Sequence, residues 1–211
     1  VPSAIEYVFA TPDEIEELQE RAMSNDLEDA AEALVLVHAG SLCGSARMFI
    51  GKQEADSARQ AVLQEVADHR GPLIVIDGFL SDELSSHEQA LIDEALAENA
   101  ASGHLALRLW GCDAGESPYP SWAPFGASME GAVFDGQEEA ATAIAPRLAD
   151  HRILVTGAWA TEDLSTGCAS SVLVALREAL GSAAEVEHSD HVVYEPDPSL
   201  DDDCENDEPE I

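Results

Sequence analysis

The chain has very few basic residues. Nine Lys and Arg stand against forty-three Asp and Glu, which gives a formal net charge of −34 at pH 7, and Lys52 is the only lysine. A surface with this charge repels phosphate groups. We therefore expect neither nucleic acid nor an anionic membrane as a partner.

Three explanations of the acidity compete. The first is a protein from a salt-accumulating cytoplasm, where an acidic and lysine-poor surface keeps proteins soluble. The second is a mimic of DNA that binds a basic partner, and the third is an acidic interaction tail. Acidic residues occur in every predicted helix while the apolar pattern of a core persists, which favours the first explanation. Stability is then expected to rise with salt, because ions screen carboxylate repulsion.

Long apolar runs and paired cysteines are also missing. No run reaches the roughly 18 residues of a membrane span, and the N-terminal stretch lacks the basic region and apolar core of a secretory signal. The four cysteines form no CxxC pair and no zinc-ribbon spacing. We therefore expect reduced thiols in a cytoplasmic protein that uses no cofactor and no metal.

Short apolar runs alternate with helical patterns along the 211 residues. The apolar runs are Ala33–Val37, Leu73–Ile76, Leu105–Trp110 and Ile153–Val155. The helical patterns span Thr11–Ala33, Ser57–His69, Ser85–Ala101, Gln137–Ala149 and a segment that begins at Cys168. This alternation predicts a three-layer α/β fold, with a mostly parallel sheet and helices on both of its faces.

The same patterns divide the chain into three parts. Residues 1–70 are predicted to form a helix–strand–helix extension that joins the same sheet, and residues 71–194 form the α/β core. The core closes with a final strand over Glu185–Tyr194. Residues 195–211 are acidic and contain several prolines, so we expect a mobile tail.

Cys168 is the first candidate for chemistry. It follows the apolar run at Ile153–Val155 and stands where a new helix begins. A thiol at a helix start lies at the positive end of the helix dipole, which favours the thiolate and suits a nucleophile. The alternative is a small apolar residue packed under the helix end.

The order of motifs from Leu73 to Tyr194 resembles the isochorismatase-like cysteine hydrolases. An apolar strand ends in Asp77, an aromatic-rich loop follows a later strand, and the turn Gly157–Thr161 precedes Cys168. The resemblance implies that Cys168 and Asp77 form a catalytic pair. The implied substrate is a small amide, ester or vinyl ether.

Aromatic side chains near this pair are the predicted substrate-binding residues. The loop from Ala114 to Gly136 contains several aromatics, and another follows Gly157. Long loops of this kind are usually functional or disordered, and aromatics argue for order. The predicted substrate-binding residues are Tyr119, Trp122, Phe134 and Trp159.

The chain departs from the family pattern in three ways. Cys168 lies eleven positions after Gly157, a longer turn than usual; the supporting Lys has no counterpart; and Gly78 replaces the glutamine after the Asp. Without the Lys, two neighbouring anions would raise each other's pKa. A non-catalytic relative with a binding or assembly role in a halophile is therefore the main alternative, and self-association remains open.

Two other motifs offer weaker hypotheses. The segment His38–Gly44 follows a strand and is similar to a nucleophile elbow, which suggests an α/β-hydrolase-like esterase, although it lacks the G-x-S-x-G pattern. Gly40, Ser41, Gly44 and Ser45 could instead cradle a phosphate. His188 and Asp190 would share one face of the final strand and could share a metal, with a solvated strand end as the alternative.

The resemblance also leads to a geometric prediction. Asp77 and the Gly157 turn each follow an apolar run, and we expect these runs to be neighbouring parallel strands about 4.8 Å apart. Ligand sites in such sheets lie at the carboxyl ends of the strands. Asp77 and Cys168 should therefore lie close together at that edge.

Overall fold

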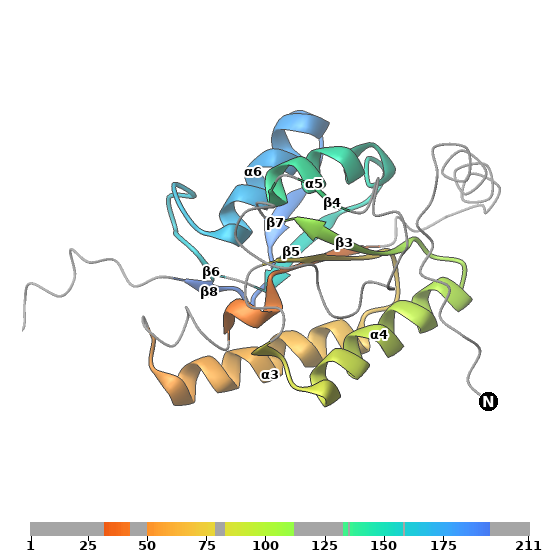
Figure 1. The fold of residues 1–211 in the computed structure, drawn as a ribbon. Coiled ribbons are helices and arrows are strands. Elements are labelled where there is room, and N and C mark those ends of the chain that lie inside the picture. Colours follow the sequence, from red (N-terminus) through yellow and green to blue (C-terminus); the bar gives the residue numbers. More distant parts are fainter. Residues whose placement is uncertain are drawn as a thin grey trace, which may run out of the picture.

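The computed structural model describes residues 32–42, 50–78, 83–111, 133–134, 136–157 and 159–194. The predicted helix at Thr11–Ala33, apart from its last two residues, and the tail at 195–211 lie outside these residues. The described elements form three layers, in which one sheet lies between two pairs of helices (Figure 1). This arrangement confirms the predicted three-layer α/β fold.

The main sheet has the order β4-β3-β2-β1-β5-β7, and every neighbouring pair is parallel. Its strands are β1 (Ala33–Val37), β2 (Leu73–Asp77), β3 (Ala106–Gly111), β4 (Val133–Phe134), β5 (Ile153–Gly157) and β7 (Val186–His188). The four predicted apolar strands are therefore parallel and central. They read as continuous apolar runs because both faces of the sheet are covered.

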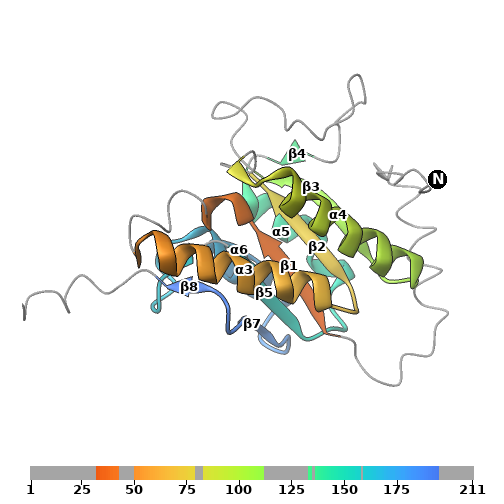
Figure 2. The same ribbon diagram turned by 90° about the horizontal axis from the view of Figure 1, so that it is seen from below.

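Two of the described helices cover each face of the sheet. Figure 2 shows α3 (Lys52–Asp68) and α4 (Ser86–Ala101) across one face. On the other face lie α5 (Gln137–Ile144) and α6 (Cys168–Leu180), and the 3-10 turn η3 (Ala145–Arg147) continues α5. Side chains alternate between these faces: Leu36 and Val75 pack on the α3–α4 face, whereas Val37 and Ile76 pack on the α5–α6 face.

The four helix predictions that fall within the described residues hold with shifted ends. α4 matches its prediction, with Ser85 as the N-cap, and α6 begins at Cys168 as expected. α3 begins at Lys52, five residues before the predicted start, and α5 gives way to the 3-10 turn at Ala145. Boundaries shift because packing on the sheet extends or ends a helix beyond its local signals.

The predicted final strand over Glu185–Tyr194 is wrong as a single element. β7 ends at His188, a turn follows, and β8 (Val193–Tyr194) pairs with β6 (Trp159–Ala160) in a separate small sheet. Ser189 is buried and its hydroxyl binds the His191 backbone N–H at 3.0 Å, which stabilises the turn between the two strands. The apolar and polar residues of this stretch alternate imperfectly because it contains two separate strands.

The first strand in the described part of the chain, β1, lies in the middle of the sheet. β1 pairs with β2 on one side and with β5 on the other, and all five of its residues are buried. The predicted N-terminal extension therefore contributes the central strand of the core. None of the described helices is long and apolar enough to cross a membrane.

Candidate functional site

The chain changes direction across the sheet at β1. From β1 it proceeds through β2 and β3 to one edge, and it then returns to β5 and β7 on the other side of β1. In open α/β sheets, ligand sites lie outside the carboxyl ends of the strands at such a reversal. The residues that follow β1 and β5, His38 and the Gly157–Cys168 connection, are therefore the ones to consider first.

Cys168 opens α6 at this edge. The preceding Gly167 is the N-cap, with φ of 99° and no side-chain cap hydrogen bond. A Cβ at Gly167 would lie 2.5 Å from the Trp159 carbonyl oxygen, so only glycine fits there. The Cys168 side chain is partly buried and packs against the apolar cluster of the α5–α6 face.

Asp77 is held in a buried ion pair. Its side chain is 1% exposed, and its carboxylate accepts a 2.5 Å hydrogen bond from Nε of Arg108, which is 2% exposed. Arg108 also donates to Asp93 at 2.5 Å and to Gln89 at 2.6 Å, both on α4. Asp77 therefore belongs to a network on the α3–α4 face.

The pKa values of both members of the pair are raised above their ordinary values. Burial raises the pKa of Asp77, and the neighbouring Arg108 guanidinium opposes this rise. Burial alone would lower the pKa of Arg108, but Asp77 and Asp93 raise it above its ordinary value. We describe the pair as ionised, because a guanidinium only donates and its short contact with Asp77 needs an acceptor.

The structure does not bring Asp77 and Cys168 together. The prediction that their strands are neighbours is wrong, because β1 lies between β2 and β5, which separates them by about 9.6 Å, two strand spacings. The two side chains also pack on opposite faces of the sheet, Asp77 toward α4 and Cys168 toward the α5–α6 cluster. Arg108, which sequence reasoning missed, is the partner of Asp77.

His188 is the titratable side chain that the structure brings to the first turn of α6. Burial lowers the pKa of His188. The backbone of Ala169 lies beside the ring and opposes this shift, although it makes no hydrogen bond of ordinary geometry with Nε2. The Nδ1 atom lies 3.0 Å from the Tyr194 hydroxyl, and the two rings meet edge to face. The Nε2 atom is buried without a hydrogen-bond partner in the part of the chain that the structure describes.

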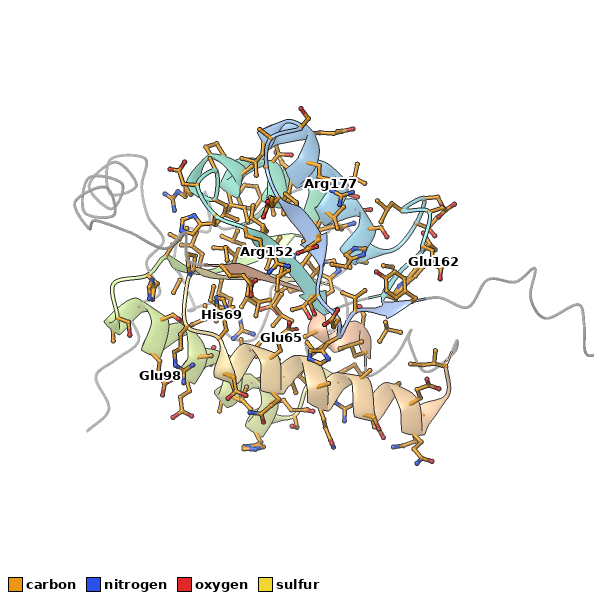
Figure 3. The ribbon with its side chains drawn as sticks, turned by 180° about the vertical axis from the view of Figure 1, so that it is seen from behind. Glu65, His69, Glu98, Arg152, Glu162 and Arg177 are labelled. Atoms are coloured by element: carbon orange, nitrogen blue, oxygen red, sulfur yellow. The ribbon has the colours of Figure 1, made fainter. Side chains whose placement is uncertain are left out.

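The sheet alternation explains why His188 points toward α6. Val186, two residues earlier on β7, packs in the α5–α6 cluster, and alternate residues of a strand share a face. Tyr194 keeps its hydroxyl proton, because burial and the charge of Glu162 raise its pKa. Figure 3 labels Glu162, on the loop that leads into α6.

The predicted substrate-binding aromatics do not form one group among the described residues. Trp159 lies on β6 and packs against the α3–α4 cluster, whereas Phe134 lies on β4 and packs against the α5–α6 cluster. Trp159 and Cys168 therefore pack against different clusters. Tyr119 and Trp122 lie outside the described residues.

The weaker sequence hypotheses gain no support from the described residues. Ser41 lies in the 3-10 turn η1 (Ala39–Leu42) with 3% exposure, not on an exposed elbow. Gly44 and Ser45 of the phosphate cradle lie outside the description. Asp190 follows the end of β7, so it does not share a strand face with His188, and no group of three or more metal-binding side chains occurs in the described ranges.

A polar cluster joins α3 to β5 and to the turn that follows β7. Glu65 accepts hydrogen bonds from the hydroxyls of Thr156 at 2.7 Å and Ser189 at 2.9 Å. Figure 3 shows Glu65 between α3 and the sheet. Glu65, His69 and His191 line an open groove of about 650 Å³. Because this groove lies on the α3 side, it is separate from Cys168.

No family model matches the chain, and no curated protein and no solved structure matches it either. The fold and the geometry of this edge are therefore the basis for any functional assignment.

Proposed function

We propose that the chain is a hydrolase of a small ester or amide, with Cys168 as the nucleophile and His188 as its proton acceptor. The observation that carries this proposal is the position of Cys168 at the start of α6, at the carboxyl edge of the sheet, with the His188 ring beside the next residue. His188 replaces Asp77, which the resemblance implied as the base, because Asp77 is bound by Arg108 on the other face.

The chemistry follows from these positions. His188 takes the thiol proton as the Cys168 sulfur attacks the carbonyl carbon, and the backbone N–H groups at the start of α6 stabilise the oxyanion. The C–O or C–N bond breaks, the leaving group receives the proton from His188, and a thioester remains. Water then attacks the thioester while His188 accepts its proton, and the acid and the thiol are released.

Tyr194 supports the imidazole in this scheme. A general base needs one ring nitrogen fixed so that the other faces the nucleophile. In this scheme the Nδ1–H donates to the Tyr194 hydroxyl oxygen, 3.0 Å away, and Nε2 is left unprotonated to face α6. The lowered pKa of His188 keeps the ring neutral near pH 7, the state in which it can accept a proton.

A second candidate is a binding or assembly protein without catalysis. One observation favours it: the carboxylate that the family resemblance requires for catalysis is buried in an ion pair with Arg108. In this case Cys168 packs under the end of α6 as a small apolar residue. The two candidates differ in the reactivity of Cys168.

The test uses a variant in which Cys43, Cys112 and Cys204 are replaced by Ser, so that Cys168 is the only thiol. The rate of alkylation by iodoacetamide is measured near neutral pH in the folded and the unfolded protein, together with turnover of p-nitrophenyl acetate. We expect folded Cys168 to react about tenfold faster than the unfolded chain, because of the helix start and His188. Cys168→Ser should abolish turnover.

A matched pair of variants tests the role of His188. His188→Gln should slow alkylation and turnover by about tenfold or more. His151→Gln is the control, because His151 is also partly buried with a lowered pKa but lies just before β5, at the amino edge of the sheet. Alkylation no faster than in the unfolded chain, or equal effects of the two variants, would overturn the hydrolase proposal in favour of the binding role.

A further inference from the structure

His38 is held in an unusual position after β1. It has a φ of 42°, a left-handed conformation that is uncommon for residues other than glycine. Its backbone N–H binds the Ile76 carbonyl of β2 at 2.9 Å, and its own carbonyl accepts the Ser41 N–H at 2.8 Å. His38 thus connects the central strands to η1, whose four residues are all buried.

The His38 ring is buried and its tautomer is defined. The side chain is 3% exposed, and Nε2 lies 3.0 Å from the Gly111 carbonyl at the end of β3. A carbonyl only accepts hydrogen bonds, so Nε2 carries the proton and Nδ1 is an acceptor. Nδ1 is buried with no hydrogen-bond partner among the residues that the structure describes.

The ring fits tightly over the neighbouring strand. A Cβ at Gly78 would lie 2.3 Å from Nε2 of His38, so the ring occupies the space that a side chain at this position would need. The His38 ring therefore cannot move far unless the turn after β1 moves too.

The charged groups that face His38 come from two elements, β2 and α5. Asp77 at the end of β2 and Glu138 on α5 both favour the protonated ring, but burial outweighs them and lowers the pKa of His38. Asp77 is already bound to Arg108 of β3, and Glu138 is exposed to solvent. In the structure, neither carboxylate makes a hydrogen bond with Nδ1.

We propose that His38 makes the turn after β1 sensitive to acid, so that protonation of Nδ1 opens η1 while the sheet stays folded. A protonated ring would bury a charge and a second donor that has no acceptor in the described surroundings. Opening lets His38 leave its left-handed conformation and reach water. The strands remain, because β1 is held by hydrogen bonds with both β2 and β5.

The direction of the pH effect follows from linkage. The closed turn binds the proton less well than the open turn, because the pKa of His38 in the fold is below the ordinary histidine value of 6.5. The protection of the turn's amide hydrogens from exchange should therefore be constant above about pH 6.5. Below it, protection should fall by up to about tenfold per pH unit until the pKa of the closed turn is reached.

The experiment is hydrogen exchange of the full chain by mass spectrometry, read on peptides that cover Ser41 and Leu42. Exchange is measured at about pH 5 and about pH 8 in about 2 M KCl, which keeps charge repulsion screened throughout. Rates are divided by the intrinsic rates at the same pH. We expect protection of the turn to fall at least about tenfold at the lower pH, while peptides of β2 and β5 stay protected.

Variants assign the effect to His38. His38→Asn tolerates the left-handed conformation and does not titrate, so its turn should show the same protection at both pH values. His38→Gln is a second variant that keeps a donor for the Gly111 carbonyl. His69→Gln is the control, because His69 also has a lowered pKa but binds Pro72 at the opposite end of β2.

Three results would overturn the proposal: no loss of protection in the natural chain, the same loss in both His38 variants, or a loss that His69→Gln removes. If both His38 variants are unfolded, the shift of the His38 ring nitrogens with pH in the natural chain decides instead. A ring that titrates at about 6.5 or above, as an exposed histidine does, also contradicts the proposal.

Discussion

At the scale of single residues, Arg108 is the most constrained charge in the described part of the molecule. Its side chain is 2% exposed, and the guanidinium binds Asp77 and Asp93 as well as the Gln89 side chain. A buried carboxylate is tolerated only when it is paired, because its desolvation is costly. Arg108 therefore makes it possible for Asp77 to lie inside the fold.

Arg108→Met should lower the free energy of unfolding by about 3–5 kcal/mol, because it leaves Asp77 buried without its partner. Urea denaturation near neutral pH measures the loss. Arg70→Met is the control: Arg70 pairs with Glu98 at the surface, where the two side chains are 57% and 51% exposed. This control should lose less than about 1 kcal/mol. Equal losses in the two variants would contradict the importance of the buried network.

At the scale of elements, the start of α4 shows how local signals position a helix. The Ser85 hydroxyl accepts the Glu88 backbone N–H at 3.3 Å, and the Glu88 carboxylate accepts the Ser85 backbone N–H at 2.7 Å. This reciprocal capping box satisfies two donors that the helix itself cannot. Glu88 also binds Arg59 of α3 at 2.7 Å, so the cap ties the two helices of one face together.

Ser85→Ala should destabilise the protein by about 1 kcal/mol, because the N-terminal N–H groups of α4 lose their acceptor. Thermal unfolding at fixed salt measures the change. Ser86→Ala, at the adjacent exposed position inside the helix, is the control and should leave stability nearly unchanged. A loss of similar size in Ser86→Ala would attribute the effect to the helix sequence instead of the cap.

At the scale of the whole molecule, the net charge of −34 is the dominant property. The core is ordinary, since β1 and β2 are buried and apolar helix faces cover both sides. Repulsion between carboxylates therefore acts against a fold that is otherwise well packed. This combination motivates a prediction about salt.

The melting temperature should rise between about 0.1 M and about 2 M KCl, because the Debye length falls from about 10 Å to below 3 Å and repulsion is screened. KCl is the right salt, since sulfate would also strengthen apolar burial. A melting temperature that stays constant or falls over this range would count against an adaptation to a salt-rich cytoplasm.

The sequence by itself determined the layers and most of the elements. Ala33–Val37 and Leu73–Ile76 are apolar runs of strand length, and this pattern is local: it follows from burial on both faces and needs no knowledge of neighbours. The start of α6 at Cys168 and the helix that begins near Ser85 were predicted for the same reason. The single final strand failed because the turn at Ser189 depends on hydrogen bonds to Glu65, far away in the chain.

Only the tertiary structure decided which residues meet. Strand order is a long-range property, and the position of β1 between β2 and β5 separates Asp77 from Cys168. The alternation of side chains then places them on opposite faces, and it brings Arg108 to Asp77 and His188 to α6. No local pattern carries this information, because it arises when strands distant in sequence pair and bury their side chains together.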